Sequence, residues 1–314
     1  MAADYEMMVE MYDDLGEDSA VFDDSDVAHV VVHENRVVGA NLVPGLTVET
    51  AEMTDGVALQ VGVEEGTQID QRVHMCFGVL PEEGLQTIDL DVDIEADSMI
   101  DILAHCVFPN AVDITHEMEA QINVGPGASY RYLEKHVHGE GGGVDVIPRA
   151  KVHLAEGAHF GTEFELVQGR VGQIDIDYET WCAAESSLQM VARIAGSGDD
   201  RINIREVGHL AGESSAGALL SRIAVEGEAE AEVYNEMTAS APYARGHVDC
   251  KEVVQDDAIA RAVPVVDVRH PLARVTHEAS IGSVDSKQLQ TLLVRGMDEE
   301  EAVEMIVQGM LGAS

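Results

Sequence analysis

The spacing of apolar residues changes twice along the chain. From Asp4 to Leu15 apolar residues recur every three or four positions, as on one face of a helix that Gly16 can end. From about residue 27 to residue 275, short apolar runs alternate with Gly, Asn, Asp or charged pairs, a pattern typical of β-strands. Helical spacing returns after Asp285. These changes predict an N-terminal helical segment over residues 1–20, a β core over 21–284 and a C-terminal helical segment over 285–314.

The β core contains more than ten strand-like runs with few helices between them, which excludes a doubly wound α/β fold. A sandwich of about 100 residues cannot use so many strands, whereas a β-solenoid stacks any number. No repeat motif is visible at a fixed period, so the pattern alone leaves sandwich, barrel and solenoid open. The runs are His29–Val32, Val57–Val63, Val73–Leu80, Thr87–Ile94, Ile100–Phe108, Ala120–Val124, Lys151–Leu154, Gln173–Ile176, Leu188–Ile194, Arg201–Val207, Ala218–Val225 and Ala262–Val268.

The C-terminal segment reads as two short helices. Ser286 is the expected N-cap of the first helix, and Gly296 ends it. Asp298, with Glu301 three residues later, starts the second helix in a pattern close to a capping box. Such a helical hairpin could cap the last strands of the β core or bind a partner.

The net charge of the chain indicates in which environment the protein works and which partners it disfavours. The chain has 18 basic and 59 acidic residues, a formal net charge of -41. This charge disfavours binding to nucleic acid or to anionic membranes, and it resembles the proteins of halophiles that accumulate salt. We expect nearly all of these carboxylates to lie on the solvated surface.

Neither a membrane span nor a secretory leader is visible, so we expect a cytoplasmic protein without a membrane partner. The four cysteines are far apart and form no CxxC pair, which disfavours zinc ribbons, ferredoxins and thioredoxin-type sites. The chain also lacks HExxH, GxSxG and Walker A motifs, so zinc protease, α/β-hydrolase and nucleotidase chemistry are not supported.

Cys250, His277 and Glu278 combine a thiol, an imidazole and a carboxylate in one strand-rich region. These groups ligate iron or zinc and also form nucleophile–base pairs, and their spacing does not decide between the two. Two further pairs are two residues apart in strand-like runs and could each supply two ligands: His74 with Cys76, and His136 with His138. Cys106, which lies in an apolar run, is expected to be a core residue.

The sequence around Cys250 resembles the C-terminal half of the SufB/SufD family of iron-sulfur cluster assembly scaffolds. By this resemblance the chain looks like a short, single-chain, archaeal-type member of the family. The resemblance covers the chain from about Tyr130 onward. It is carried by the segments 246–250, 268–274, 276–279, 286–289, 295–302 and 305–310.

This resemblance implies a mainly β fold, a right-handed parallel β-helix. It implies a scaffold rather than an enzyme, with a transient iron-sulfur cluster held by Cys250, His277 and Glu278. A SufC-type ABC ATPase would hydrolyse ATP and dock on the C-terminal segment, and acceptor proteins would receive the cluster. Because one chain carries features of both SufB and SufD, a homodimer would replace the usual heterodimer. Ala155 stands where the family has a sulfur-receiving cysteine, which puts persulfide delivery by that route in doubt.

Two other functions remain as alternatives. The chain could be a non-catalytic interaction scaffold that has lost cluster chemistry, although it keeps all three candidate ligands. It could also be a β-helix enzyme that acts on polysaccharide. Trp181 is the only tryptophan for sugar stacking, and no leader for secretion is visible, so the sequence disfavours this second alternative.

Overall fold

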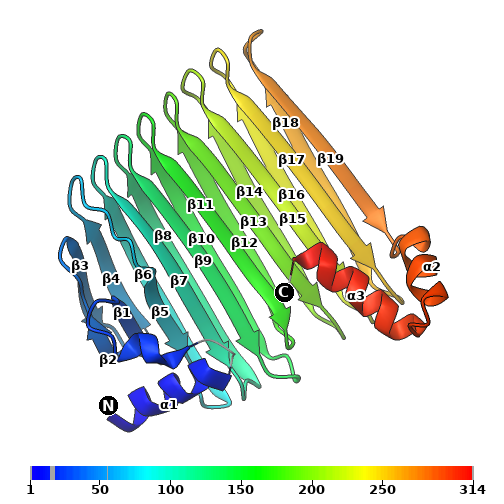
Figure 1. Ribbon diagram of the computed structural model, residues 1–314, viewed down its shortest axis with the longest axis horizontal. Coiled ribbons are helices and arrows are strands. Elements are labelled where there is room, and N and C mark those ends of the chain that lie inside the picture. Colours follow the sequence, from blue (N-terminus) through cyan, green and yellow to red (C-terminus); the bar gives the residue numbers. More distant parts are fainter. Residues whose placement is uncertain (1, 15–17, 55, 313–314) are drawn as a thin grey trace.

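The computed structural model describes residues 2–14, 18–54 and 56–312. The chain winds as a flattened β-solenoid whose successive strands alternate between two facing sheets, with helices at both termini (Figure 1). Among the described residues one sheet has ten strands and the other has nine. The predicted β-helix, with an N-terminal helix and two C-terminal helices, is thereby confirmed.

The ten-stranded sheet, called sheet A below, contains β1, β2 and the odd-numbered strands from β5 onward, and the nine-stranded sheet B contains β3 and the even-numbered strands from β4. The elements are α1 (Ala2–Asp14), η1 (Ser19–Phe22), β1 (His29–His33), β2 (Arg36–Asn41), β3 (Leu46–Glu52), β4 (Gly56–Val63), β5 (Val73–Gly78), β6 (Glu83–Ile94), β7 (Met99–Phe108), β8 (Asp113–Val124), β9 (Ser129–His138), β10 (Val144–Leu154), β11 (His159–Gln168), β12 (Gly172–Cys182), β13 (Ser187–Gly196), β14 (Arg201–Leu210), β15 (Ala216–Val225), β16 (Glu230–Ala239), β17 (Arg245–Val254), β18 (Ile259–Val268), β19 (Arg274–Gly282), α2 (Ser286–Val294) and α3 (Glu299–Leu311).

Apart from the first pair at the N-terminal end of each sheet, neighbouring strands are parallel and come from successive turns. Ile114 pairs with Val144, 30 residues later, and Val144 pairs with Gly172, 28 residues later. Parallel partners in register point to the same face of the sheet, so inward positions stack in columns along the solenoid. The strands are longer than the apolar runs seen in the sequence because their outward positions are polar.

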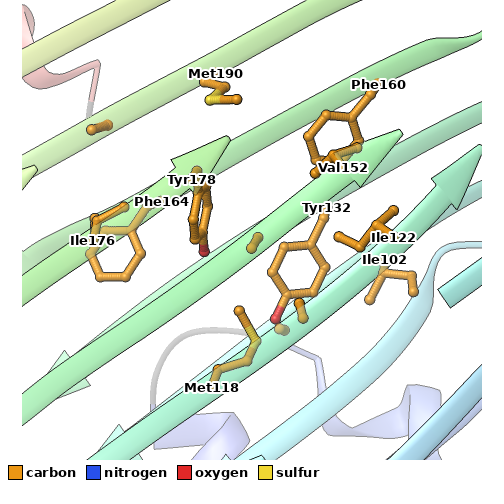
Figure 2. Packing of buried hydrophobic residues seen from close by; sticks show 14 of the residues in the cluster. Ile102, Met118, Ile122, Tyr132, Val152, Phe160, Phe164, Ile176, Tyr178 and Met190 are labelled. Carbon is orange, nitrogen blue, oxygen red and sulfur yellow. The ribbon is translucent and has the colours of Figure 1, made fainter. Parts of the chain in front are cut away.

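Inward side chains from both sheets meet in a continuous core (Figure 2). Tyr132 of β9 and Met118 of β8 face each other from opposite sheets, and Tyr178 and Phe164 lie nearby. Val, Ile, Leu and Ala fill most of the remaining interior. Aromatic residues make up only 4% of the chain, in keeping with this small-residue core.

The N-terminal end of the solenoid is closed. β2 pairs antiparallel with β1, and β3 pairs antiparallel with β4, so the parallel stacking stops there. Helix α1 packs Met8 and Tyr12 onto the outer face of sheet A, where the Tyr12 hydroxyl lies 2.7 Å from His74 Nδ1. The predicted helix end at Leu15 and Gly16 lies outside the described residues.

The C-terminal end is different, because β18 and β19 are the last strands of their sheets. Helices α2 and α3 follow, and α3 is tied to sheet A by a hydrogen bond from Arg193 Nη1 to the Leu311 carbonyl, 2.8 Å long. Asp285 caps α2 by accepting hydrogen bonds from the amides of Lys287 and Gln288, so the predicted N-cap Ser286 is wrong by one residue. Asp298 caps α3 as predicted.

Acidic side chains line the outer face of sheet B around β6 and β8. On β6 the inward positions are buried while Asp89, Asp91 and Asp93 are exposed, and Asp89 lies in register with Glu119 of β8. Like charges on neighbouring strands repel each other, and the repulsion is strongest where salt does not screen it. None of the described helices is long and apolar enough to cross a membrane.

We predict that the fold needs salt. Lowering the salt concentration from about 1 M to about 0.1 M lengthens the screening distance from roughly 3 to roughly 10 Å, so repulsion between stacked carboxylates should grow. The melting temperature, measured by circular dichroism in a potassium chloride series, should fall steadily as salt is removed. A melting temperature that does not depend on salt would contradict the halophilic interpretation.

Candidate metal-binding sites

Cys250 lies on the inner face of β17 and is fully buried. Its register partner on β15 is Ser221, and the side-chain amide of Asn235, in the opposite sheet, lies 3.7 Å from its Sγ. Burial raises the pKa of the Cys250 thiol. A thiol that is protonated at rest becomes a thiolate ligand when a metal ion replaces the proton.

His277 and Glu278 lie on the last strand of sheet A, and both are exposed. His277 is in register with inward-facing Val248, so it shares the inner face with Cys250. Because Cys250 pairs with Ala279, strand geometry puts the Cα atoms of Cys250 and His277 roughly 8 Å apart. Glu278 is in register with Asp249 and faces the opposite side of the sheet. One chain therefore presents Cys250 and His277 on one face and Glu278 on the other.

A second carboxylate lies near Cys250 and was not singled out from the sequence. Glu252 is two residues after Cys250, on the same inner face of β17, and it is buried. Neither of its carboxylate oxygens has a hydrogen-bond partner, and burial raises its pKa to about 7. The alternation of side chains along a strand was the signal that could have identified it.

A separate group of potential ligands lies inside the solenoid near its N-terminal end. One ligand atom from each of Cys106, His116, Glu134 and His136 lies within 4.8 Å of the others, and all four residues are buried. Cys106 is buried as predicted, but the sequence analysis assigned it only to the core. The sequence pattern pairs His136 only with His138 and gives no signal for Glu134. The group became visible through the register, which pairs Cys106 with His136 across β7 and β9.

The His74–Cys76 pair, which was also singled out from the sequence, is packed against a helix. His74 and Cys76 lie on the outer face of sheet A beneath α1, and Cys76 packs in the apolar cluster with Met8 and Phe22. Among the residues that the structure describes, this pair belongs to no group of three or more clustered metal ligands.

Comparison with known proteins places the whole architecture in one family. The family model for the SUF system FeS cluster assembly SufBD core domain matches residues 81–310. An iron-sulfur cluster assembly SufBD family protein of Methanocaldococcus jannaschii is 36% identical over 283 residues, covering 90% of each chain. One from Pyrococcus horikoshii is 32% identical over 309 residues, covering 98% of this chain and 94% of the relative.

A third relative, from Methanothermobacter thermautotrophicus, is 25% identical over 250 residues, which is 76% of this chain and 58% of that protein. The matched region includes both groups of potential ligands described above. The chain belongs to the SufBD family of SUF iron-sulfur cluster assembly proteins.

Proposed function

We propose that this chain is a scaffold on which a nascent iron-sulfur cluster is built and from which it passes to acceptor proteins. Membership of the SufBD family implies a role in cluster assembly. The observation that carries the more specific proposal is the position of Cys250 and His277 on one inner face, beside the open last strands of the solenoid. The cluster is cargo in this proposal, and the chain itself is not an enzyme.

The ligand types suit temporary binding of a cluster. A thiolate from Cys250 binds iron strongly, whereas imidazole and carboxylate ligands exchange more readily. A cluster meant for long-term electron transfer is usually held by four cysteines. Mixed ligation by Cys250, His277 and a carboxylate therefore favours release to an acceptor. The resemblance puts Ala155 where the family has a sulfur-receiving cysteine, which argues against delivery through an internal persulfide, and we propose that sulfide supplies the sulfur.

The same end of the molecule is suited to pairing with a second copy. β18 and β19 are edge strands, and unpaired edges can add further strands. Their charges balance, with Arg261 and Arg274 against Asp267 and Glu278, although the whole chain carries -41. We propose a twofold homodimer across these edges, which would bring the candidate ligands of two chains together.

The C-terminal helices are the proposed docking site for a SufC-type ATPase. Helix α2 buries none of its side chains, and α3 buries only Ala302 and Leu311. Val294 and Met305 are 88% and 50% exposed, which leaves apolar surface for a partner. ATP hydrolysis would come from that partner, since the sequence has no Walker A loop. The cytoplasmic location stays a prediction.

The polysaccharide-enzyme alternative loses support from the environment of Trp181. On the outer face of sheet B this ring is stacked between His153 and His209, at centroid distances of 4.8 and 5.3 Å. Both faces of the indole are therefore covered, and neither offers the flat platform on which a sugar ring stacks. The non-catalytic scaffold is the second candidate, and cluster content decides between it and the proposal.

Dimer formation is predicted to depend on the inner face of the edge strands. Val266 of β18 is in register with buried, inward-facing Met237. A charge at this position would be buried without a partner in the dimer, so Val266→Glu should weaken dimerisation at least about 100-fold. Sedimentation equilibrium in multimolar potassium chloride measures the effect.

The matched control is Val263→Glu, because Val263 lies on the same strand but is in register with Tyr234 on the outer face. It adds the same charge and should leave the dimer intact. A parent chain that is monomeric at micromolar concentration, or a dimer that tolerates both variants, would rule out the proposed interface.

Cluster assembly is predicted to require Cys250. Cys250→Ser should abolish cluster accumulation while secondary structure is kept, because a hydroxyl cannot supply a soft thiolate at neutral pH. His277→Ala should weaken assembly. Iron and acid-labile sulfide per chain, measured after anaerobic reconstitution with the ATPase, give the answer. Cys182→Ser is the control, since Cys182 is also buried on an inner face but lies several strands away. Full cluster content in Cys250→Ser would remove the proposed assembly site.

Neutral variants can distinguish the roles of the two carboxylates near this site. Glu252 shares the inner face with Cys250, and Glu278 lies on the opposite face at the edge. If Glu278 is a ligand, it acts across the dimer interface, and Glu278→Gln should lower cluster content. A mixed dimer that keeps one intact copy should lose less of its cluster than a dimer in which both copies carry the change. Loss of cluster in Glu252→Gln, with none in Glu278→Gln, would transfer the carboxylate role to Glu252.

A further inference from the structure

We propose that the interior of the solenoid holds a divalent transition-metal ion bound by Cys106, His116, Glu134 and His136. This site is separate from the proposed assembly site at the C-terminal edge. Cys106 comes from β7, Glu134 and His136 from β9 of the same sheet, and His116 from β8 of the opposite sheet. The ion would therefore link the two sheets across the core.

The hydrogen bonds of His136 determine which of its nitrogens can bind a metal. His138 Nδ1 lies 3.3 Å from the Arg170 carbonyl, which can only accept, so this nitrogen carries the proton. Neutral His138 then accepts at Nε2, 3.2 Å from His136 Nδ1, which must donate. His136 Nε2 is left with a lone pair.

His116 is fixed in the same way. The Gln86 amide nitrogen donates to the Glu34 carbonyl over 2.6 Å, so the amide oxygen is the atom that lies 3.0 Å from His116 Nδ1. His116 Nδ1 therefore donates, and Nε2 keeps its lone pair. Ring nitrogens held by hydrogen bonds of this kind are the usual support for histidines that bind metals.

Two atoms that both offer lone pairs face each other in the group. Glu134 Oε1 lies 2.7 Å from His136 Nε2 and 3.9 Å from Cys106 Sγ, and Glu134 Oε2 is buried without a hydrogen-bond partner. A proton on Glu134 Oε1 would satisfy the contact with His136, and the Cys106 thiol could donate to the same oxygen, but Oε2 would stay without a partner. A single cation would satisfy the carboxylate, both imidazoles and the thiolate together.

The donor set and its surroundings indicate the kind of ion. One sulfur, two nitrogen and one oxygen ligand match tetrahedral zinc or iron(II), and zinc should bind more tightly. Ligands about 2.0–2.3 Å from the ion lie roughly 3.5 Å from one another, so the present spread of 4.8 Å needs only small side-chain movements. A thiolate and a carboxylate balance the two positive charges.

The site is closed to solvent. The ring of Phe164 stacks on His136 at a centroid distance of 4.6 Å, and Phe108 lies 5.0 Å from His116. Four protein ligands in an apolar shell leave no open coordination position, which is typical of a structural metal site rather than a catalytic one. The ion would be captured as the solenoid forms and should exchange slowly once the protein is folded.

Zinc binding by the full-length chain tests the proposal. The parent for the test is the Cys250→Ser/His277→Ala double variant, in which the proposed assembly site cannot contribute. It is unfolded in denaturant with a chelator and refolded in potassium chloride with or without zinc. We expect about one zinc per chain by mass spectrometry of the metal, and a higher melting temperature with zinc. Cobalt(II) in place of zinc should give thiolate charge-transfer absorption.

Glu134→Gln is the decisive variant, because its amide can donate to His136 Nε2 as a protonated carboxyl would, yet it removes the anionic ligand. In the double-variant parent it should fold and bind zinc at least about tenfold more weakly, and Cys106→Ser should also lose the cobalt absorption. Cys182→Ser is the control and should change neither. A refolded parent that binds no zinc, or Glu134→Gln and Cys106→Ser proteins that bind it as tightly as the parent, would overturn the proposal.

Discussion

The parallel register between successive turns is the constraint on which the rest of this structure depends. From β6 to β19 nearly all register partners on successive turns are 28 to 30 residues apart, as between Ile114, Val144 and Gly172. A slip of one residue would turn every inward side chain outward, so the apolar columns of the core fix the register strongly. The register in turn decides which polar residues become neighbours, because partners on adjacent turns share a face.

The fold could be predicted from the sequence, but the length of its repeat could not. Short apolar runs indicated stacked strands, and the family resemblance selected the solenoid. The repeat itself stayed hidden at the corners, where one left-handed backbone position recurs at residues 97, 127, 157, 185, 214 and 243. Glycine supplies this conformation most easily, but only Gly127 and Gly157 of the six are glycines. Since Asp, Glu, Ser and Tyr occupy the others, no sequence motif marks the period.

The candidate sites show the same limit. Cys250 could be singled out from its neighbours in the sequence, and Glu252 could have been added from strand alternation alone. The group around Glu134 could not, because its members come from three strands and meet only when β7 stacks on β9 and both face β8. Without the turn length, Cys106 and His136 have no visible relation.

The buried carboxylates argue that the interior serves more than stability. Burial raises the pKa of Glu134 to about 7 and of Glu206 to about 8, so the folded chain holds each carboxyl where ionisation is costly. An apolar side chain of similar size would pack the solenoid with less cost. At the same time the outer faces carry the acidic surface, while the edge strands β18 and β19 balance their own charges. Strand edges invite association and the overall charge opposes it, so the balanced charges of β18 and β19 support the proposal that a second copy pairs at these edges.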